Sequence, residues 1–270
     1  MNPHEEFKRE AQANLVALSQ DKDMQALSRV WVREVSPYKW AYNFTWMGRP
    51  AIQFPNDAWA VQEIVWSIKP DLIIEAGIAH GGSLMFSASM LALLEMEEAI
   101  KEGRSFDPRK PKRKVLGLDI DIRAHNKEAI EAHPMAHWIQ MIQGSSISKE
   151  VISQVHEIAK RYKTVMVLLD SNHTHEHVLG ELQAYAPLTS KGSYCVVFDT
   201  LVEDMPKALS GDRPWAPGNS PKTAVWKYLD QLKQQPHIGS DGQPLGFEID
   251  KLMDAKLQIS VAPDGYLKRV

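Results

Sequence analysis

A glycine-rich turn between an apolar run and a helical segment constrains the fold of this chain more than any other feature. The apolar run is Asp71-Leu-Ile-Ile-Glu75, the turn is Gly77-Ile-Ala-His-Gly-Gly-Ser83, and a Met/Leu/Ala-rich segment follows over 84–95. Strand, turn and helix in this order are typical of parallel α/β sheets, in which ligands bind where strands end and helices begin. Glycines let a ligand approach the backbone, and helix N-termini attract negative groups. Glu75 adds a carboxylate that suits a hydroxyl or an amine.

The glycine spacing differs from that of a dinucleotide site. The turn is Gly-x-x-x-Gly-Gly, whereas nicotinamide-binding turns are Gly-x-Gly-x-x-Gly. The next strand-end acid, Asp119, lies much further along than the roughly 20 residues expected for a ribose-binding acid in such enzymes. A nicotinamide dehydrogenase is therefore disfavoured. The glycines alone would fit a plain tight turn, but together with Asp119 they favour a nucleoside ligand.

Apolar, strand-like runs alternate with helical segments along the chain. Strands are expected at 71–75, 114–119, 138–142, 164–170 and 192–199, with 247–249 and 256–261 as the last strands. Helices are expected at 58–67, 84–95, 126–132, 149–161, 175–185 and 223–234, and Asn56 or Asp57 is expected to cap the first of these. This alternation predicts an α/β fold with a mostly parallel sheet and helices on both faces.

The chain divides in composition near residue 55. Residues 1–30 predict one or two amphipathic helices, and 30–55 are rich in aromatic residues, so we expect an N-terminal appendage over 1–55 and the main α/β domain over 56–270. Within that domain, the Pro- and Gly-rich stretch 211–221 predicts a long loop or lid.

Charge and cysteine content limit the partners and the compartment. The net charge of −3 gives no case for general nucleic-acid binding, which leaves a basic footprint. The single cysteine, Cys195, excludes an intrachain disulfide and fits a reducing compartment. The first ten residues are polar, and no run of 18 apolar residues occurs. We therefore expect a cytoplasmic protein without a membrane span.

Four acids, Glu75, Asp119, Asp170 and Asp199, end strand-like runs. Any one of them could be a helix N-cap, but four together favour a shared crevice at the carboxyl edge of the sheet. Asp170 also opens a polar cluster with three alternating histidines at 173, 175 and 177.

Carboxylates suit magnesium, and imidazoles suit zinc. The His-x-His-x-His spacing is not the i, i+4 pattern of a zinc hydrolase, and the histidines begin a helix that would turn them apart. We therefore expect Asp170 to bind a divalent cation and one histidine to act as general base.

Several stretches together resemble a known family. They are Gly48-Arg-Pro-Ala-Ile-Gln53-Phe-Pro, Glu75-Ala-Gly-Ile-Ala-His-Gly-Gly-Ser83, Gly117-Leu-Asp-Ile-Asp121, Leu169-Asp-Ser-Asn-His-Thr-His-Glu-His177, Tyr185-Ala-Pro-Leu, Trp215-Ala-Pro-Gly-Asn-Ser-Pro221 and Pro263-Asp-Gly-Tyr-Leu-Lys-Arg269. From about residue 40 onward, the sequence resembles the cephalosporin hydroxylase / rhamnosyl O-methyltransferase family. This family is a branch of the class I S-adenosylmethionine-dependent methyltransferases.

The resemblance implies a Rossmann-like, seven-stranded methyltransferase domain over 56–270 and a set of site residues. Cofactor contacts are expected from Gln53, Glu75, Gly77, Ser83, Asp119, Ser145 and Asp170, with Glu75, Gly77 and Ser83 at the methionine part, Asp119 at the ribose and Ser145 near adenine. Mg²⁺ is expected at Asp170 and Asp199, with His173 as the base that acts beside Asp170 in catalysis. Where the family has a Glu-Asp pair, this chain has Phe198-Asp199, which removes one carboxylate from the expected metal site.

The resemblance also implies an activity. It is O-methylation of a sugar hydroxyl on a glycan, glycolipid or secondary metabolite, with the assistance of a divalent cation. A homo-oligomer is also expected, because the aromatic-rich N-terminal segment could supply a subunit contact. The alternative is a non-methylating cephalosporin-hydroxylase-like binding or partner protein, which the missing carboxylate at Phe198 favours.

Overall fold

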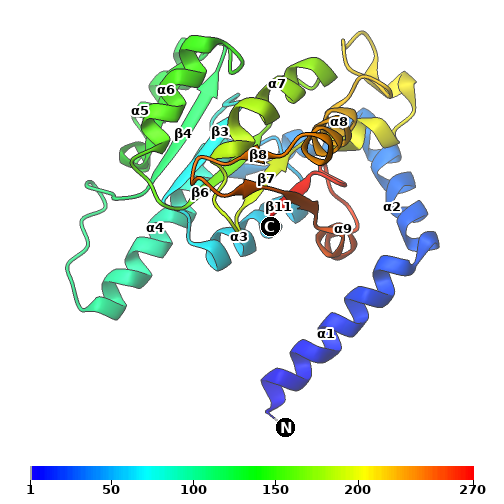
Figure 1. The fold of residues 1–270 in the computed structure, drawn as a ribbon, viewed down its shortest axis with the longest axis horizontal. Helices are drawn as coiled ribbons and strands as arrows, with labels where there is room; N and C mark the ends of the chain where they lie inside the picture. Colours follow the sequence, from blue (N-terminus) through cyan, green and yellow to red (C-terminus); the bar gives the residue numbers. More distant parts are fainter. Residues whose placement is uncertain (1) are drawn as a thin grey trace.

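A computed structural model describes residues 2–270, and a seven-stranded sheet forms its centre (Figure 1). The strands are β3 (Leu72–Ala76), β4 (Lys114–Asp119), β5 (Ile139–Gln143), β6 (Val165–Leu169), β7 (Tyr194–Val197), β10 (Phe247–Ile249) and β11 (Tyr266–Arg269). Their order is β5-β4-β3-β6-β7-β11-β10, and within this sheet of the described chain only β11 runs antiparallel to its neighbours. The order along the chain reverses between β3 and β6, which is where α/β sheets place ligands.

Helices cover both faces of the sheet, as predicted. Helices α3 (Pro55–Ile68), α4 (Gly82–Glu102), α5 (Ala124–Glu131) and α9 (Lys251–Leu257) contribute to one hydrophobic core, whereas α6 (Lys149–Ala159), α7 (His175–Tyr185) and α8 (Pro221–Gln234) contribute to the other. Alternation along β3 separates the two cores, because Ile73 packs into the first and Leu72 and Ile74 into the second. All residues of β3 and β6 are buried, as expected for central parallel strands.

Two expectations for the chain ends of this domain are wrong. Residues 256–261 do not form a strand, because α9 extends to Leu257 and the last strand is β11. Asp57 does not cap α3, which begins at Pro55 without a side-chain cap. The fully buried Asp57 carboxylate instead accepts hydrogen bonds from Ser260 Oγ (2.6 Å), Val261 N (2.9 Å) and Tyr266 Oη (2.7 Å). Because the Asp57 carboxylate accepts a hydrogen bond from Val261 N, this backbone group needs no partner from a neighbouring strand.

The N-terminal residues form the expected helices. Helix α1 (Pro3–Gln20) contacts α9, and α2 (Lys22–Val35) follows it along the chain. The N-terminal end of α1 points away from the sheet (Figure 1). Val32 is the one buried residue of the described part of these helices, and Phe7, Leu27 and Trp31 are exposed. No helix within residues 2–270 is long and apolar enough to cross a membrane. The division at residue 55 stays a prediction.

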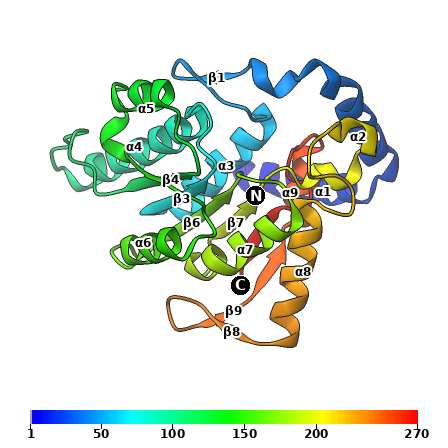
Figure 2. The same cartoon turned by 90° about the horizontal axis from the view of Figure 1, so that it is seen from above.

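Short hairpins complete the fold. The strands β1 (Thr45–Trp46) and β2 (Arg49–Pro50) pack beside the start of α4, where a Cβ on Gly82 would lie 2.2 Å from the Pro50 carbonyl oxygen. The Arg49 guanidinium donates to the carbonyl of His80 at 2.7 Å, which joins this hairpin to the glycine turn. A second hairpin, β8 (His237–Ile238) and β9 (Pro244–Leu245), projects near α8 (Figure 2).

Gly77 allows β3 and β6 to end side by side. Its φ of +99° is left-handed, and a Cβ at this position would lie 2.0 Å from the carbonyl oxygen of Asp170. By contrast, Gly103, with a φ of +63°, has nothing within 4 Å of its Cβ position.

We predict that Gly77→Ala destabilises the protein by about 3 kcal/mol, because left-handed strain adds to a backbone clash. Gly103→Ala, the control, should cost about 1 kcal/mol, because it adds the strain alone. Urea unfolding with unchanged m-values would measure both. Equal costs for the two variants would contradict the close approach at Asp170.

Candidate functional site

The strand-end acids meet at the carboxyl edge of the central strands, beside the glycine turn. The Asp170 backbone N–H donates to the Ala76 carbonyl at 2.8 Å, and Gly77 N donates to Leu118 O at 2.8 Å. The turn that follows β3 is therefore held between the ends of β4 and β6. This arrangement brings Glu75, Gly77, Ser83 and Asp170 together.

Asp119 shapes the turn. Its Oδ2 accepts from the backbone N–H groups of Ile78 (2.9 Å) and Ala79 (3.2 Å), and its Oδ1 accepts from Asp121 N at 3.0 Å. Directly after it, Ile120 is 71% exposed.

Glu75 is a buried carboxylate with an incomplete set of partners. The residue is 2% exposed, and its Oε2 accepts a hydrogen bond from Ser87 Oγ at 3.1 Å. Its Oε1 is buried and has no hydrogen-bond partner within residues 2–270. Burial raises the pKa of Glu75 to about 7, although the nearby hydroxyl groups of Ser83 and Ser87 oppose that rise.

Gln53 reaches the same place from the N-terminal segment. Its Nε2 donates to Asp170 Oδ2 at 2.8 Å, while its Oε1 is buried without a partner in the described chain. Gln53, Glu75, Ser83 and Asp170 line one cavity. Two residues that line the same cavity thus each carry a buried acceptor without a donor, and such groups are rare unless a ligand or water satisfies them.

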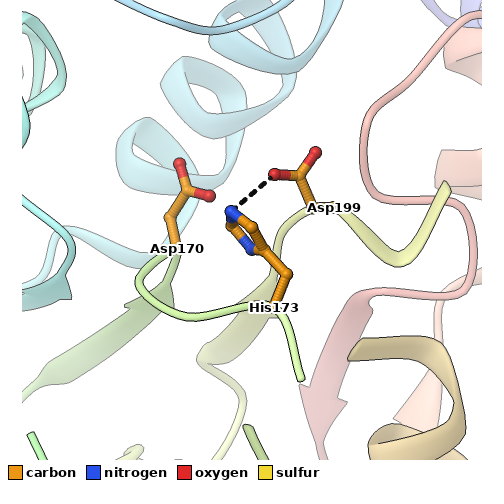
Figure 3. A group of neighbouring side chains, drawn as sticks. All are labelled: Asp170, His173 and Asp199. Carbon is orange, nitrogen blue, oxygen red and sulfur yellow. Dashed lines mark ion pairs between the residues drawn. The ribbon is translucent and has the colours of Figure 1, made fainter. Parts of the chain in front are cut away.

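A compact acidic group lies next to these residues. Ligand atoms of Asp170, His173 and Asp199 all lie within 4.8 Å of one another (Figure 3). His173 Nε2 is 3.1 Å from Asp199 Oδ2, and Asp199 adopts a left-handed φ of 54°, a strained conformation that clusters at functional sites. Burial, followed by repulsion from Asp199 and Glu75, raises the pKa of Asp170 well above its ordinary value. A bound cation would relieve that repulsion.

The lid loop contacts this group. Trp215 meets the His173 ring edge-on, with 4.8 Å between ring centroids. The end of the loop that leads into α8 is anchored, because Glu203 accepts from Gly218 N at 2.9 Å and Asn219 Oδ1 accepts from His175 N at 2.9 Å. Sequence reasoning identified the loop but missed the contact between Trp215 and His173.

The remaining predicted residues lie nearby or outside the group. His175 Nδ1 bonds to Thr223 Oγ1 at 2.8 Å, and His177 Nε2 lies 2.9 Å from Ser146 Oγ, so these two imidazoles point away from the Asp–His–Asp group. Ser145 is half-buried at the end of β5. Phe198 is 5% exposed and belongs to the hydrophobic core. The zinc arrangement of three histidines is therefore absent from the described residues.

Comparison with known proteins identifies the family. The family model "Rhamnosyl O-methyltransferase/CmcI" matches residues 38–270. The chain belongs to this family. This membership confirms the predicted resemblance and the predicted class of enzyme, an O-methyltransferase.

Relatives of known name agree. The rhamnosyl O-methyltransferase of Mycobacterium leprae (strain TN) is 30% identical over 241 residues, which cover 86% of this chain and 88% of the relative. That of Mycobacterium tuberculosis is 28% identical over 239 residues, which cover 86% and 83%. A solved CmcI structure described as holding Mg and SAM has a TM-score of 0.51 and 16% identity over 85% of this chain and 77% of that one. This likeness confirms the predicted class I methyltransferase fold.

The raised pKa of Glu75 predicts a pH-dependent cost to stability. Below the ordinary value of 4.5, the carboxyl is protonated in both the folded and the unfolded chain. Between 4.5 and about 7, only the unfolded chain loses the proton, so folding stability falls as pH rises through this window and stays low above it.

Glu75→Gln should therefore stabilise the ligand-free protein at pH 8 and raise its unfolding free energy by up to roughly 3 kcal/mol, which is seen as a higher melting temperature. The gain should shrink toward pH 5. Thermal unfolding of both proteins across pH 5–8 measures it, and a difference that is constant with pH would contradict the buried, ionised Glu75.

Proposed function

We propose that this protein transfers the methyl group of S-adenosylmethionine to a sugar hydroxyl with the help of a divalent cation. The observation that carries the proposal is the Asp–His–Asp group beside the glycine turn and its unpaired buried acceptors. The named relatives are rhamnosyl O-methyltransferases, which supports a sugar as the acceptor. A solved relative in fold that holds Mg and SAM supports the two cofactors.

The residues at the glycine turn suit S-adenosylmethionine, which supplies an electrophilic methyl group on sulfur when it is bound. The free oxygens of Glu75 and Gln53 would accept hydrogen bonds from its amino group, next to Ser83. Gly77 holds the turn against the backbone of Asp170, which keeps Glu75 and Asp170 close to each other. Asp119 would meet the ribose, while Ile120 and Ser145 would meet the adenine ring.

Asp170 and Asp199 suit a divalent cation, because two carboxylates face the same point. A cation bound there would lower the pKa of a hydroxyl beside it. Phe198 offers no ligand atom, so the site has two protein carboxylates, and Mg²⁺ tolerates such sites because it keeps several waters.

His173 is the base in this proposal. Its contact with Asp199 fixes the ring and would stabilise the positive charge that the imidazole gains when it takes the hydroxyl proton. Trp215 packs on the same ring, so the lid loop both orients the base and excludes water. Holding acceptor and methyl donor together supplies much of the rate gain, since orientation alone contributes ~7–11 kcal/mol.

Phe198 favours a second candidate, a non-methylating binding or partner protein of the cephalosporin hydroxylase type. The carboxylate expected in the family is replaced here by a buried ring. Such a protein would bind the cofactor without transferring its methyl group.

Assembly and location belong to the same proposal. The exposed apolar residues of α1 and α2, such as Phe7 and Leu27, support a homo-oligomer. The buried free thiol of Cys195 is compatible with the reducing cytoplasm.

Calorimetric titration with S-adenosylmethionine tests the proposed function. We expect binding that Mg²⁺ strengthens, and we expect Asp170→Asn to remove the Mg²⁺ effect because one of two carboxylates is lost. Asp230→Asn, an exposed acid on α8, is the control and should keep the effect. Absence of cofactor binding to the wild-type protein would refute the methyltransferase proposal, and binding without transfer to any sugar acceptor would favour the second candidate.

His173→Ala should reduce kcat by about 10²–10⁴-fold and leave the affinity for S-adenosylmethionine nearly unchanged, because a general base contributes only to the chemical step. His175→Ala, whose ring bonds to Thr223, should reduce kcat far less. Steady-state kinetics and calorimetry on both variants provide the comparison. If the Mg²⁺ effect on binding disappears in His173→Ala, the imidazole is a metal ligand and not the base.

A further inference from the structure

Glu203 joins the lid loop to the segment that carries Asp199. Asp199 directly precedes a short 3₁₀ helix, η5 (Thr200–Asp204), on which Glu203 lies. The Glu203 carboxylate accepts from the backbone N–H of Gly218 at 2.9 Å and from Ser220 Oγ at 2.7 Å. Both donors belong to the end of the lid loop, so this carboxylate links two segments that are separate along the chain.

The part of the lid loop that Glu203 holds is a closed turn. Ala216 and Asn219 exchange two backbone hydrogen bonds, at 3.1 and 2.8 Å, and the Asn219 side chain donates to the Pro214 carbonyl at 2.8 Å. Trp215 lies within this turn, so its position follows that of the turn as a whole. Glu203 therefore holds the part of the lid that contains Trp215.

Asp199 depends on restraints from its surroundings. Its left-handed φ of 54° is costly for a residue with a side chain and persists only where neighbouring contacts hold it. The start of η5 is fixed to the C-terminal part of the chain, because Thr200 Oγ1 donates to the Pro263 carbonyl at 2.7 Å. Glu203 supplies the restraint near the other end of this short helix.

These contacts close a ring around the Asp–His–Asp group. His173 Nε2 lies 3.1 Å from Asp199 Oδ2 on one side (Figure 3), and the His173 ring meets Trp215 on the other. Glu203 completes the ring, because it ties the turn that contains Trp215 to the helix that follows Asp199. The imidazole, the carboxylate and the lid thus share one set of restraints, although Glu203 is not a member of the group itself.

We propose that Glu203 is a positioning residue that couples the lid loop to the cation site. Because the lid turn and the Asp199 segment share one carboxylate, a cation at Asp199 stabilises the lid over His173, and an ordered lid strengthens cation binding by the same factor. This inference rests on the proposed function, because it takes Asp170 and Asp199 as the cation ligands. It adds the residue that connects cation binding to the lid.

The next acid along the chain provides a matched control. Asp204 pairs with Lys222 on α8 at 2.5 Å, so its contact leads away from the lid turn. Asp204→Ala removes that contact and leaves Lys222 with Asp264, 3.6 Å away. Glu203→Ala removes the acceptor of both lid donors, whereas Glu203→Gln keeps one oxygen that can accept from both.

The first measurement is hydrogen–deuterium exchange of the ligand-free protein. In Glu203→Ala, the backbone amides of 199–204 and of 213–219 should both exchange faster than in the wild type. The lid amides of Glu203→Gln and Asp204→Ala should exchange at the wild-type rate, because both variants keep an acceptor for Gly218. Added Mg²⁺, with S-adenosylmethionine present, should slow lid exchange in the wild type but not in Glu203→Ala.

The second measurement is calorimetric titration of Mg²⁺ into protein that is saturated with S-adenosylmethionine. Glu203→Ala should weaken Mg²⁺ binding by about tenfold, which corresponds to the loss of about one hydrogen bond to a charged acceptor. Glu203→Gln and Asp204→Ala should keep the wild-type affinity. All variants should bind S-adenosylmethionine without Mg²⁺ as the wild type does, because Glu203 and Asp204 lie outside the lining of the cavity that Glu75 and Gln53 share.

The outcomes separate this inference from the proposed function. Faster exchange in the lid alone, or wild-type Mg²⁺ affinity in Glu203→Ala, overturns the coupling. An equal loss of Mg²⁺ affinity in Asp204→Ala also overturns it, because Glu203 would then be one of several general stabilising contacts. A wild type that binds S-adenosylmethionine but not Mg²⁺ overturns the role at the cation site, whereas a wild type that does not bind S-adenosylmethionine overturns the proposed function itself.

Discussion

The contact between Gly77 and the backbone of Asp170 determines the geometry of the rest of the site. β3 and β6 are neighbours at the centre of the sheet, and both end where the chain order reverses. Because Gly77 has no Cβ, the turn after β3 lies directly against the carbonyl of Asp170. Glu75 and Asp170 therefore line one cavity. Gln53 also lines it and donates a hydrogen bond to Asp170. A side chain at position 77 would separate the two strand ends and with them the two halves of the site.

This geometry has an energetic cost, which is concentrated on the acids. Burial raises the pKa of both Glu75 and Asp170. Repulsion from the neighbouring Asp199 and Glu75 raises the pKa of Asp170 further. In the ligand-free protein, the unpaired oxygens of Glu75 and Gln53 add to that cost. A cationic amine and a divalent cation are the two kinds of group that would relieve it. These groups therefore lower the stability of the ligand-free protein, and such a loss of stability is typical of a site that binds ligands.

Much of this fold could be predicted from the sequence where clear start and stop signals bound each helix or strand. The segments 114–119, 175–185 and 247–249 match the observed elements at both ends, because charged or turn-forming residues flank each apolar pattern. The failure at 256–261 has a physical reason. Val261 N donates to the Asp57 side chain, and Val261 O accepts from Leu201 N, so an apolar segment is satisfied without joining the sheet.

One part of the candidate site could be predicted from the sequence, and another part could not. The strand-end acids are predictable, since parallel strands bring their carboxyl ends to one edge. Contacts such as Trp215 on His173 join segments more than forty positions apart and leave no local pattern. The cavity that Gln53, Glu75 and Asp170 line is also invisible in the sequence, because the apolar residues around it are indistinguishable from those that fill a core.

Phe198 links the metal group to the cavity that Glu75 and Asp170 line. It directly precedes Asp199, and its ring lines that cavity together with Leu168. A carboxylate at this position would add a metal ligand, but it would also place a further negative charge in the wall that Phe198 shares with Glu75 and Asp170. The phenyl ring removes the ligand and leaves an apolar surface there. The same residue therefore weakens the case for a strongly bound cation, and it avoids a further repulsion on two acids whose pKa is already raised.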